Sequence, residues 1–326
     1  LFLLENGIAA NLEVSFILLL GLSFRLLGGW PVVDGDTRSE LLSADWNGEW
    51  MRLQAARHRA DDSFEWDKRA RHFRPLETAP YARDFIKLLA LEPSESVLDM
   101  GCGAGSIAIP LAQAGHPVIA ADFSPAMLGT LDAGIEYYGL EDRITPLELA
   151  WDDDWDLVGP VAKTVDVAFA SRSVTTNDLK GALAKLDRTA RRRCAVTMVA
   201  NSSPRYDLRL MNAIGASVTC SNGFVYAFNI LIQMGALPQV TYFESPRRDT
   251  FDSLEAGVAD FSRMLEHGNE DKIDRLRDYV AQHMIENPHA GEPGSKGVPQ
   301  GRYMLDHVRK VRWAFIAWEP VSSSRP

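Results

Sequence analysis

Short apolar runs alternate with longer amphipathic stretches from residue 96 onward. The amphipathic stretches have the periodicity of helices that bury one face. Buried strands separated by helices of this length indicate parallel β-α-β units with right-handed crossovers. The runs predicted to be strands are 96–100, 118–121, 144–149, 165–170 and 195–200, and the predicted helices are 106–114, 125–138 and 178–190.

The pattern continues towards the C-terminus with two more strands, at 240–244 and 312–318. A helical region at 204–235 precedes the first of them. Two helices are predicted within 250–285, between these strands. The stretch 287–301 holds three prolines and four glycines and is therefore expected to be a loop.

The N-terminal part has a different character. Its first 36 residues are an apolar leader of uncertain status, in which the eleven uncharged residues 14–24 lie between Glu13 and Arg25. A spanning helix needs about 20 apolar residues, so a buried or interfacial helix is favoured over a membrane anchor, which stays the alternative. Residues 37–90 are predicted to be helical, with a helix at 80–90, and the main domain is assigned to 91–326, with an insertion at 247–301.

Composition narrows the classes of function. The chain has 326 residues, of which 44 are acidic and 34 basic, giving a net charge of −10. This balance argues against a broad nucleic-acid surface, and we expect Arg191-Arg192-Arg193 to form a solvated turn. The three cysteines are too far apart for a zinc pair or a disulfide framework, which favours a reducing compartment and predicts a cytoplasmic protein.

The segment that carries chemistry is a strand, a glycine loop and a helix. The strand ends in Asp99, and Gly101, Gly103 and Gly105 follow it. Glycines allow sharp turns and close approach of the backbone to a ligand, and the helix N-terminus favours an anionic group. Asp122 ends the next strand, where a carboxylate can accept hydrogen bonds from a ribose diol.

The spacing of the glycines separates two kinds of nucleotide site. A dinucleotide fingerprint requires a glycine or alanine at the sixth position of G-x-G-x-x-G, but that position is Ser106. The sequence G-x-G-x-G after a strand-terminal acid, with Asp122-Phe123-Ser124-Pro125-Ala126-Met127-Leu128 beyond it, instead resembles the class I, Rossmann-like methyltransferases that use S-adenosylmethionine. The likeness extends over about 64–319.

The resemblance implies an α/β fold with a seven-stranded, mostly parallel, doubly wound sheet whose last strand is antiparallel. It also implies an N-terminal helical cover over the cofactor. The acid before the glycines and the loop backbone would hold the methionine part of the cofactor, and the acid after the second strand its ribose. The residues expected to contact S-adenosylmethionine are Asp99, Gly101, Cys102, Gly103, Gly105, Asp122, Phe123, Ser124, Met127, Trp151, Asp152, Ser171 and Trp66.

The acceptor is expected to be a small molecule. The motif N/D-P-P-F/Y of many nitrogen methyltransferases is absent after the fourth strand, where Arg172 would line the acceptor pocket together with Phe224 and Tyr226. An acceptor of high pKa needs a general base. The weak candidates for this base are His72, Tyr206 and Tyr226.

Other functions remain as alternatives. A non-catalytic module that binds S-adenosylmethionine would share the same motif, and a nicotinamide-dependent oxidoreductase is disfavoured by Ser106. No metal is expected. Asp152, Asp154 and Asp156 imitate a calcium loop, but Leu157 and Lys163 stand where that loop needs glycine and glutamate.

Overall fold

A seven-stranded sheet forms the centre of the chain. The computed structural model describes residues 44–56, 80–160, 162–174, 176–218, 222–265, 270–294 and 299–321. The chain divides into two units, 1–44 and 45–326, and all the elements named below belong to the second. The strands are β1 (Val97–Met100), β2 (Val118–Asp122), β3 (Ile144–Glu148), β4 (Val165–Ser171), β5 (Ala190–Val199), β6 (Gln239–Arg247) and β10 (Arg309–Trp318).

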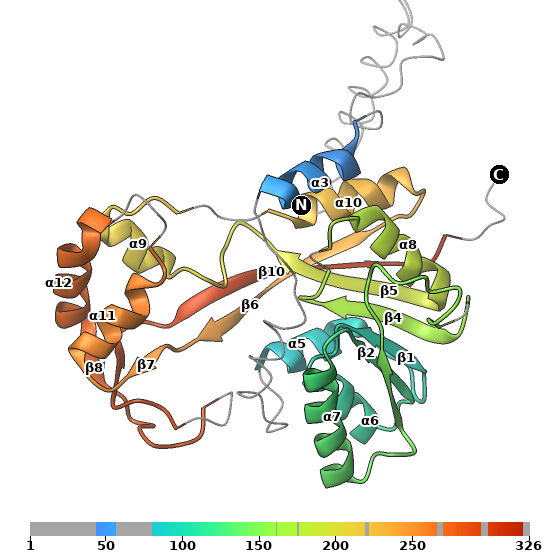
Figure 1. Cartoon of the computed structure of the whole chain (residues 1–326), viewed down its shortest axis with the longest axis horizontal. Coiled ribbons are helices and arrows are strands. Elements are labelled where there is room, and N and C mark those ends of the chain that lie inside the picture. Colours follow the sequence, from blue (N-terminus) through green and yellow to red (C-terminus); the bar gives the residue numbers. More distant parts are fainter. Residues whose placement is uncertain are drawn as a thin grey trace, which may run out of the picture. The chain divides into compact units, whose positions relative to one another are not determined.

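The strand order is β3-β2-β1-β4-β5-β10-β6 (Figure 1). The first five strands pair in parallel, and β10 pairs antiparallel with both β5 and β6. The predicted α/β class, the seven strands and the antiparallel last strand are therefore confirmed. We refer to the edge where the parallel strands end as the carboxyl edge; β6 and β10 continue past it, since Trp313 of β10 pairs with Val199 at the end of β5 and the β6–β10 pairing extends on to Arg247 and Arg309.

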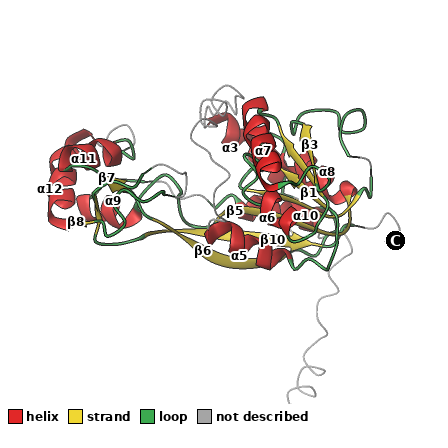
Figure 2. Ribbon diagram, turned by 90° about the horizontal axis from the view of Figure 1, so that it is seen from below, coloured by secondary structure: helices red, strands yellow, loops and turns green. Residues whose placement is uncertain are grey.

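Helices cover both faces of the sheet (Figure 2). One face packs against α5 (Pro80–Leu89), α6 (Ala108–Gln113) and α7 (Pro125–Tyr138). The other packs against α3 (Trp46–Ala56), α8 (Leu179–Thr189) and α10 (Phe224–Gln233). Strands buried on both faces explain why the sequence shows continuous apolar runs instead of alternation.

Helix α7 shows how local sequence sets these boundaries. The Ser124 side chain caps its N-terminus by accepting a hydrogen bond from the backbone N–H of Met127 at 3.2 Å. Pro125 follows at the first helical position, and Gly139 ends the helix in a left-handed conformation with φ of 64°. The predicted bounds 125–138 are thus confirmed, and α7 starts directly after the acid at the end of β2.

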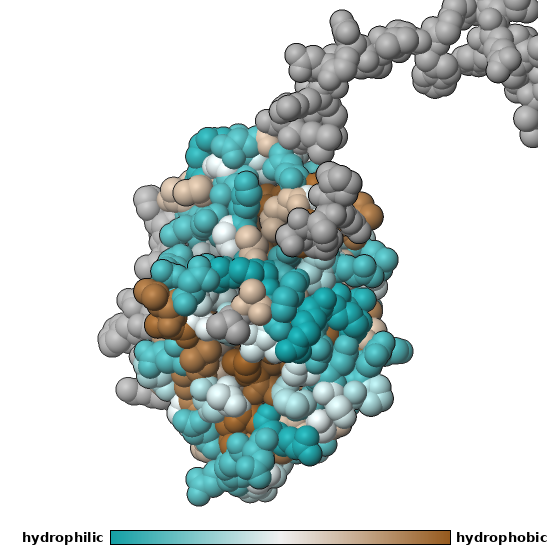
Figure 3. Space-filling view, turned by 90° about the vertical axis from the view of Figure 1, so that its right-hand side faces the viewer, coloured by the Kyte–Doolittle hydropathy of each residue, from teal (hydrophilic) through white to brown (hydrophobic). Residues whose placement is uncertain are grey.

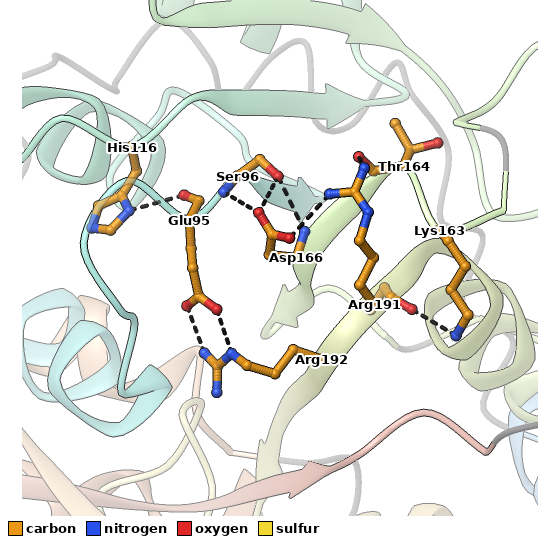
Figure 4. Close-up of polar contacts among 9 residues, drawn as sticks. Glu95, Ser96, His116, Lys163, Thr164, Asp166, Arg191 and Arg192 are labelled. Carbon is orange, nitrogen blue, oxygen red and sulfur yellow. Dashed lines mark hydrogen bonds and ion pairs between the residues drawn. The ribbon is translucent and has the colours of Figure 1, made fainter.

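The edge where the parallel strands begin is held by polar contacts (Figure 4). Asp166 accepts hydrogen bonds from the Ser96 hydroxyl at 2.7 Å and from Arg191 at 3.0 Å, and Arg192 forms a double contact with Glu95. The prediction that the arginine run forms a turn was wrong, because these residues begin β5. Their long side chains reach acids at the sheet edge, which breaks the apolar pattern of the strand.

A second cluster of elements is built from two segments of the chain, one between β5 and β6 and the other between β6 and β10. Its helices are α9 (Leu208–Ile214), α11 (Leu254–Ser262), a 3₁₀ turn (Glu270–Lys272) and α12 (Ile273–His283). A small sheet of order β7-β9-β8 joins Thr250–Phe251, Tyr303–Leu305 and Met284–Glu286. The two helices within 250–285 are confirmed. The sheet was missed, since strands of two or three residues have no readable period.

In the face shown in Figure 3 most residues are hydrophilic, and the hydrophobic ones gather mainly in its lower half. Single exposed apolar side chains such as Leu157, Tyr137 and Leu237 are ordinary for a folded protein. Among the described residues, no helix combines the length and the apolar character that crossing a membrane requires. The leader 1–36 lies outside the described residues, so its assignment remains a prediction.

Candidate functional site

The glycine loop between β1 and α6 packs closely on the segment after β4. Gly101 has φ of 77°, and a Cβ at this position would lie 2.2 Å from Cβ of Ser173. The Ser173 hydroxyl donates a 2.6 Å hydrogen bond to the Met100 carbonyl, and this bond fixes the approach of the two segments. Only glycine satisfies both the left-handed backbone and the short contact.

The carboxyl group of Asp99 is buried at the end of β1. Its residue is 1% exposed, and Oδ2 has no hydrogen-bond partner among the described residues. Burial, followed by the charge of Asp122, raises the pKa of Asp99 to about 8, while the backbone of Ala108 and the charge of Arg172 oppose the shift. A buried acceptor left without a donor costs free energy. This carboxyl is therefore suited to receive a cationic or hydrogen-bonding group from a ligand.

Asp122 ties the glycine loop to the end of β2. Its Oδ2 accepts a 2.8 Å hydrogen bond from the N–H of Gly103, and its Oδ1 accepts one of 2.9 Å from Ser124. A carboxylate oxygen can accept more than one hydrogen bond, which is the chemistry that a diol requires of its partner. Sδ of Met127 lies 4.0 Å from where a Cβ of Gly103 would stand. The structure thus brings together Gly103, Asp122, Ser124 and Met127, and it places the half-buried Phe123 between Asp122 and Ser124.

Cys102 lies in the same loop and is buried. Burial, followed by the charges of Asp99 and Asp122, raises the pKa of its thiol well above the ordinary value. The thiol is accordingly held in its protonated, weakly nucleophilic form. Gly105 packs on α7, since a Cβ there would meet the Leu131 side chain at 2.5 Å.

The segment after β3 places two stacked indoles beside the loop that follows β4. The rings of Trp151 and Trp155 lie 5.6 Å apart and nearly parallel, and Nε1 of Trp151 donates a 2.8 Å hydrogen bond to the Ser173 carbonyl. Asp152 is exposed. Trp151 is therefore connected to the glycine loop through Ser173, which also bonds the end of β1.

A hydroxyl network lies where β4 and β5 approach their ends. The hydroxyl of Tyr81 on α5 forms hydrogen bonds of 2.7 Å with Ser171 and 2.6 Å with Thr197. Burial raises the pKa of Tyr81, which disfavours a phenolate. Thr197 also accepts a 3.1 Å hydrogen bond from the backbone N–H of Arg172, whose φ of 62° is unusual outside glycine. The guanidinium of Arg172 lies 4.1 Å above the Tyr81 ring.

Sequence reasoning missed Tyr81 and Thr197. They are separated from each other by 116 residues and sit within an ordinary amphipathic helix and an apolar strand, respectively. The strand pairing could have indicated Thr197, because it lies opposite Ser171 in the β4–β5 register. No local signal marks Tyr81, whose role follows only from how α5 packs on the sheet.

The remaining predicted residues are spread over the chain. Trp66 and His72 lie outside the described residues. Tyr206 is buried in the α9–α11–α12 cluster, away from the glycine loop and its contacts. Tyr226 packs edge-on against Trp50 at 5.6 Å between ring centroids, and Phe224 packs against a tyrosine of β6. These two aromatics of α10 lie in the packing of the second sheet face.

Comparison with known proteins agrees with this geometry. A family model described as a methyltransferase domain matches residues 97–193, which include the glycine loop, β2 and β4. An uncharacterized protein of Haemophilus influenzae (strain ATCC 51907 / DSM 11121 / KW20 / Rd) is 31% identical over 273 residues, covering 82% of this chain and 92% of that protein.

Solved structures are similar to a lower degree. The YcgJ protein of Bacillus subtilis has 13% identity and a TM-score of 0.46, over 74% of this chain and 98% of its own. The geranyl diphosphate C-methyltransferase of Streptomyces coelicolor A3(2) has 15% identity and a TM-score of 0.41, over 74% and 78%. Because both scores are below 0.5, the assignment depends on the family model and the sheet order; the Haemophilus relative, itself uncharacterized, shows only how much of the chain the likeness covers. The chain belongs to the class I, Rossmann-like methyltransferase family.

Proposed function

We propose that this protein transfers a methyl group from S-adenosylmethionine to a small-molecule acceptor. The observation that carries the proposal is the orphaned carboxyl oxygen of Asp99, buried beside a loop in which Gly103 leaves room for a ligand. The amino group of the cofactor's methionine part is a cation with N–H donors, which is the partner this oxygen lacks. Gly103 supports the same fit, because no atom of the described chain lies closer than 4.0 Å to a Cβ built there.

Each group of the site has a part in this proposal. Asp99 would hold the amino group, Gly101, Gly103 and Gly105 would keep the loop close to the ligand, and Asp122 would accept hydrogen bonds from the ribose. Phe123 and Met127 would contact the adenine side of the cofactor. The other residues that would line the cofactor site are Cys102, Ser124, Trp151, Asp152 and Ser171. When bound, S-adenosylmethionine supplies a methyl group on an activated sulfonium.

The chain's own contribution is then positioning and exclusion of water. Ser171 is held by Tyr81, and Arg172 is held by Thr197, so the segment after β4 has a fixed conformation next to the glycine loop. Tyr81 keeps its proton, since burial raises its pKa. We therefore assign to Tyr81 a positioning role on Ser171. Trp66 stays a proposal as a cofactor contact, His72, Tyr206 and Tyr226 as candidates for the general base, and Phe224 and Tyr226 as acceptor-side groups.

A glycine pair tests the cofactor site with a matched control. Gly103→Ala and Gly139→Ala both place a side chain at a left-handed position, with φ of 55° and 64°, and neither Cβ meets protein atoms closer than 4.0 Å. Both variants should lose similar stability, about 1–2 kcal/mol. Only Gly103→Ala should weaken S-adenosylhomocysteine binding, by at least tenfold in titration calorimetry. Equal affinity in both variants would contradict the site.

Turnover separates an enzyme from a non-catalytic binding module. The protein is incubated with methyl-labelled S-adenosylmethionine and the small-molecule fraction of a cell extract. Label should move to an extract component with the wild type and should stay on the cofactor with Gly103→Ala. Tight cofactor binding without any transfer would favour the module.

A further inference from the structure

Two arginines lie directly opposite each other where β6 and β10 pair. Arg247 is the last residue of β6 and Arg309 is the first of β10, and the antiparallel register pairs them. Like charges directly opposite on neighbouring strands destabilise a sheet. A negative charge beside such a pair would therefore stabilise it.

The described residues supply only part of that negative charge. Arg309 is 6% exposed, and its Nη2 donates a 3.0 Å hydrogen bond to Asp249. The guanidinium of Arg247 donates one of 2.9 Å to the neutral carbonyl of Pro204. No acid forms an ion pair with Arg247 among the described residues. Desolvation, followed by the charge of Arg309, lowers the pKa of Arg247, and the charge of Asp249 opposes this shift, so one acid acts on both guanidiniums while Arg247 stays exposed.

A third arginine approaches from β4. In the β6–β10 register the residues on the same face as Arg309 include Trp313, whose ring lies 6.0 Å from the Arg172 guanidinium. Arg172 stacks on Tyr81, and no hydrogen bond or ion pair to its guanidinium is found in the described part of the chain. The charge of Arg172 also lowers the pKa of both Asp99 and Arg247. The charge of Arg172 therefore acts on both Asp99 and Arg247, and its guanidinium lies beside Tyr81 and Trp313.

All three arginines lie at or beyond the carboxyl edge of the sheet. Arg172 directly follows β4, whereas Arg247 and Arg309 lie on the part of β6 and β10 that continues past this edge, four residues beyond Trp313, which pairs with the last residue of β5. Three guanidiniums with one paired acid leave a positive surplus on a protein whose net charge is −10. Guanidinium groups match the geometry of carboxylates and phosphates.

We propose that Arg172 and Arg247, supported by Arg309 and Asp249, bind an anionic group of the methyl acceptor, a carboxylate or a phosphate. The inference rests on the proposed function, because it assigns the arginines to the acceptor of the same site. Arg172 and Arg247 hold the anion. Arg309 is held by Asp249 and does not touch the anion, but its positive charge attracts the anion electrostatically.

Binding of simple anions tests this directly. The protein saturated with S-adenosylhomocysteine is titrated with inorganic phosphate and, separately, with benzoate, at constant ionic strength set by sodium chloride. Wild-type protein should bind at least one of them, and the stronger of the two identifies the chemistry of the acceptor. Arg172→Gln and Arg247→Gln should each weaken that binding by at least tenfold.

A matched arginine and a cofactor titration make the outcomes distinct. Arg312 lies on β10, as Arg309 does, but its guanidinium is already paired with Glu244. Arg312→Gln should therefore change the affinity for the anion less than twofold. Absence of binding, or equal loss in all three variants, would overturn the proposal. Failure of the wild type to bind S-adenosylhomocysteine would instead overturn the proposed function, and the anion site with it.

Discussion

Replacing Asp99 with asparagine should remove most of the pH dependence of S-adenosylhomocysteine binding between pH 6 and pH 8. In the free protein the pKa of Asp99 is raised to about 8, first by burial. About half of the protein molecules then carry the carboxylate at pH 8, and about 1% carry it at pH 6. Because the amino group of the ligand binds the ionised carboxylate, binding should be about 50-fold weaker at pH 6 than at pH 8, a difference of about 2.3 kcal/mol.

The raised pKa of Asp99 also makes the stability of the ligand-free protein depend on pH. A carboxyl whose folded pKa lies above its unfolded value of 3.8 contributes stability at low pH, and this contribution is lost as pH rises through about 8. Asp99→Asn removes the titration. The variant should therefore gain in unfolding temperature relative to wild type as the pH is raised from 6 to 8.5.

Titration calorimetry at three pH values provides the measurement, with Asp142→Asn as a control of equal charge change on an exposed loop. The control should retain the wild-type slope. A flat Kd from pH 6 to pH 8 in the wild type would refute the reasoning, as would an unchanged slope in Asp99→Asn.

Four further variants, one of them a control, test packing and polar contacts in the fold, each by urea-induced unfolding. Gly101→Ala should lower the free energy of unfolding by about 2–4 kcal/mol, because φ is 77° and its Cβ would lie 2.2 Å from Ser173. The control Gly129→Ala lies in helix α7, and its Cβ would meet no atom within 4 Å, so it should raise the free energy of unfolding by about 0.5–1 kcal/mol. Trp50→Ala should cost about 3–5 kcal/mol, since its side chain is buried and its Nε1 donates to the Thr176 carbonyl. Asp306→Asn should cost less than about 1 kcal/mol of stability. A hydrogen bond from His283 lowers the folded pKa of Asp306, so this cost should be present above the unfolded carboxyl pKa and should disappear as the pH falls through the folded pKa. A cost for Asp306→Asn that persists unchanged at pH 3, or a Gly101→Ala protein as stable as Gly129→Ala, would contradict these assignments.

The sheet could be predicted from the sequence because both its faces are covered. Continuous apolar runs bounded by glycine and proline locate buried parallel strands well, and β2 (Val118–Asp122) and helix α7 match the prediction almost residue for residue. β5 starts earlier than predicted, at Ala190, since its first residues lie at the sheet edge and carry arginines. The glycine loop was also readable, because its chemistry depends on residues close together in the chain.

Contacts between distant segments could not be predicted in this way. The hydroxyl network joins Tyr81 of one helix to Thr197 of a strand, and the arginine pair depends on the register between β6 and β10. Neither leaves a local periodicity. The same is true of the small sheet formed by β7, β8 and β9, whose strands are shorter than any period.

The position of β10 has a consequence for how the chain folds during synthesis. This strand follows the other described strands in sequence, yet it lies between β5 and β6 and pairs with both. Until Trp318 has left the ribosome, β5 and β6 each present an open strand edge, which is a template for pairing with other chains. Closure of the sheet is thus a late, long-range step, and we expect nascent chains that stop before β10 to aggregate instead of folding.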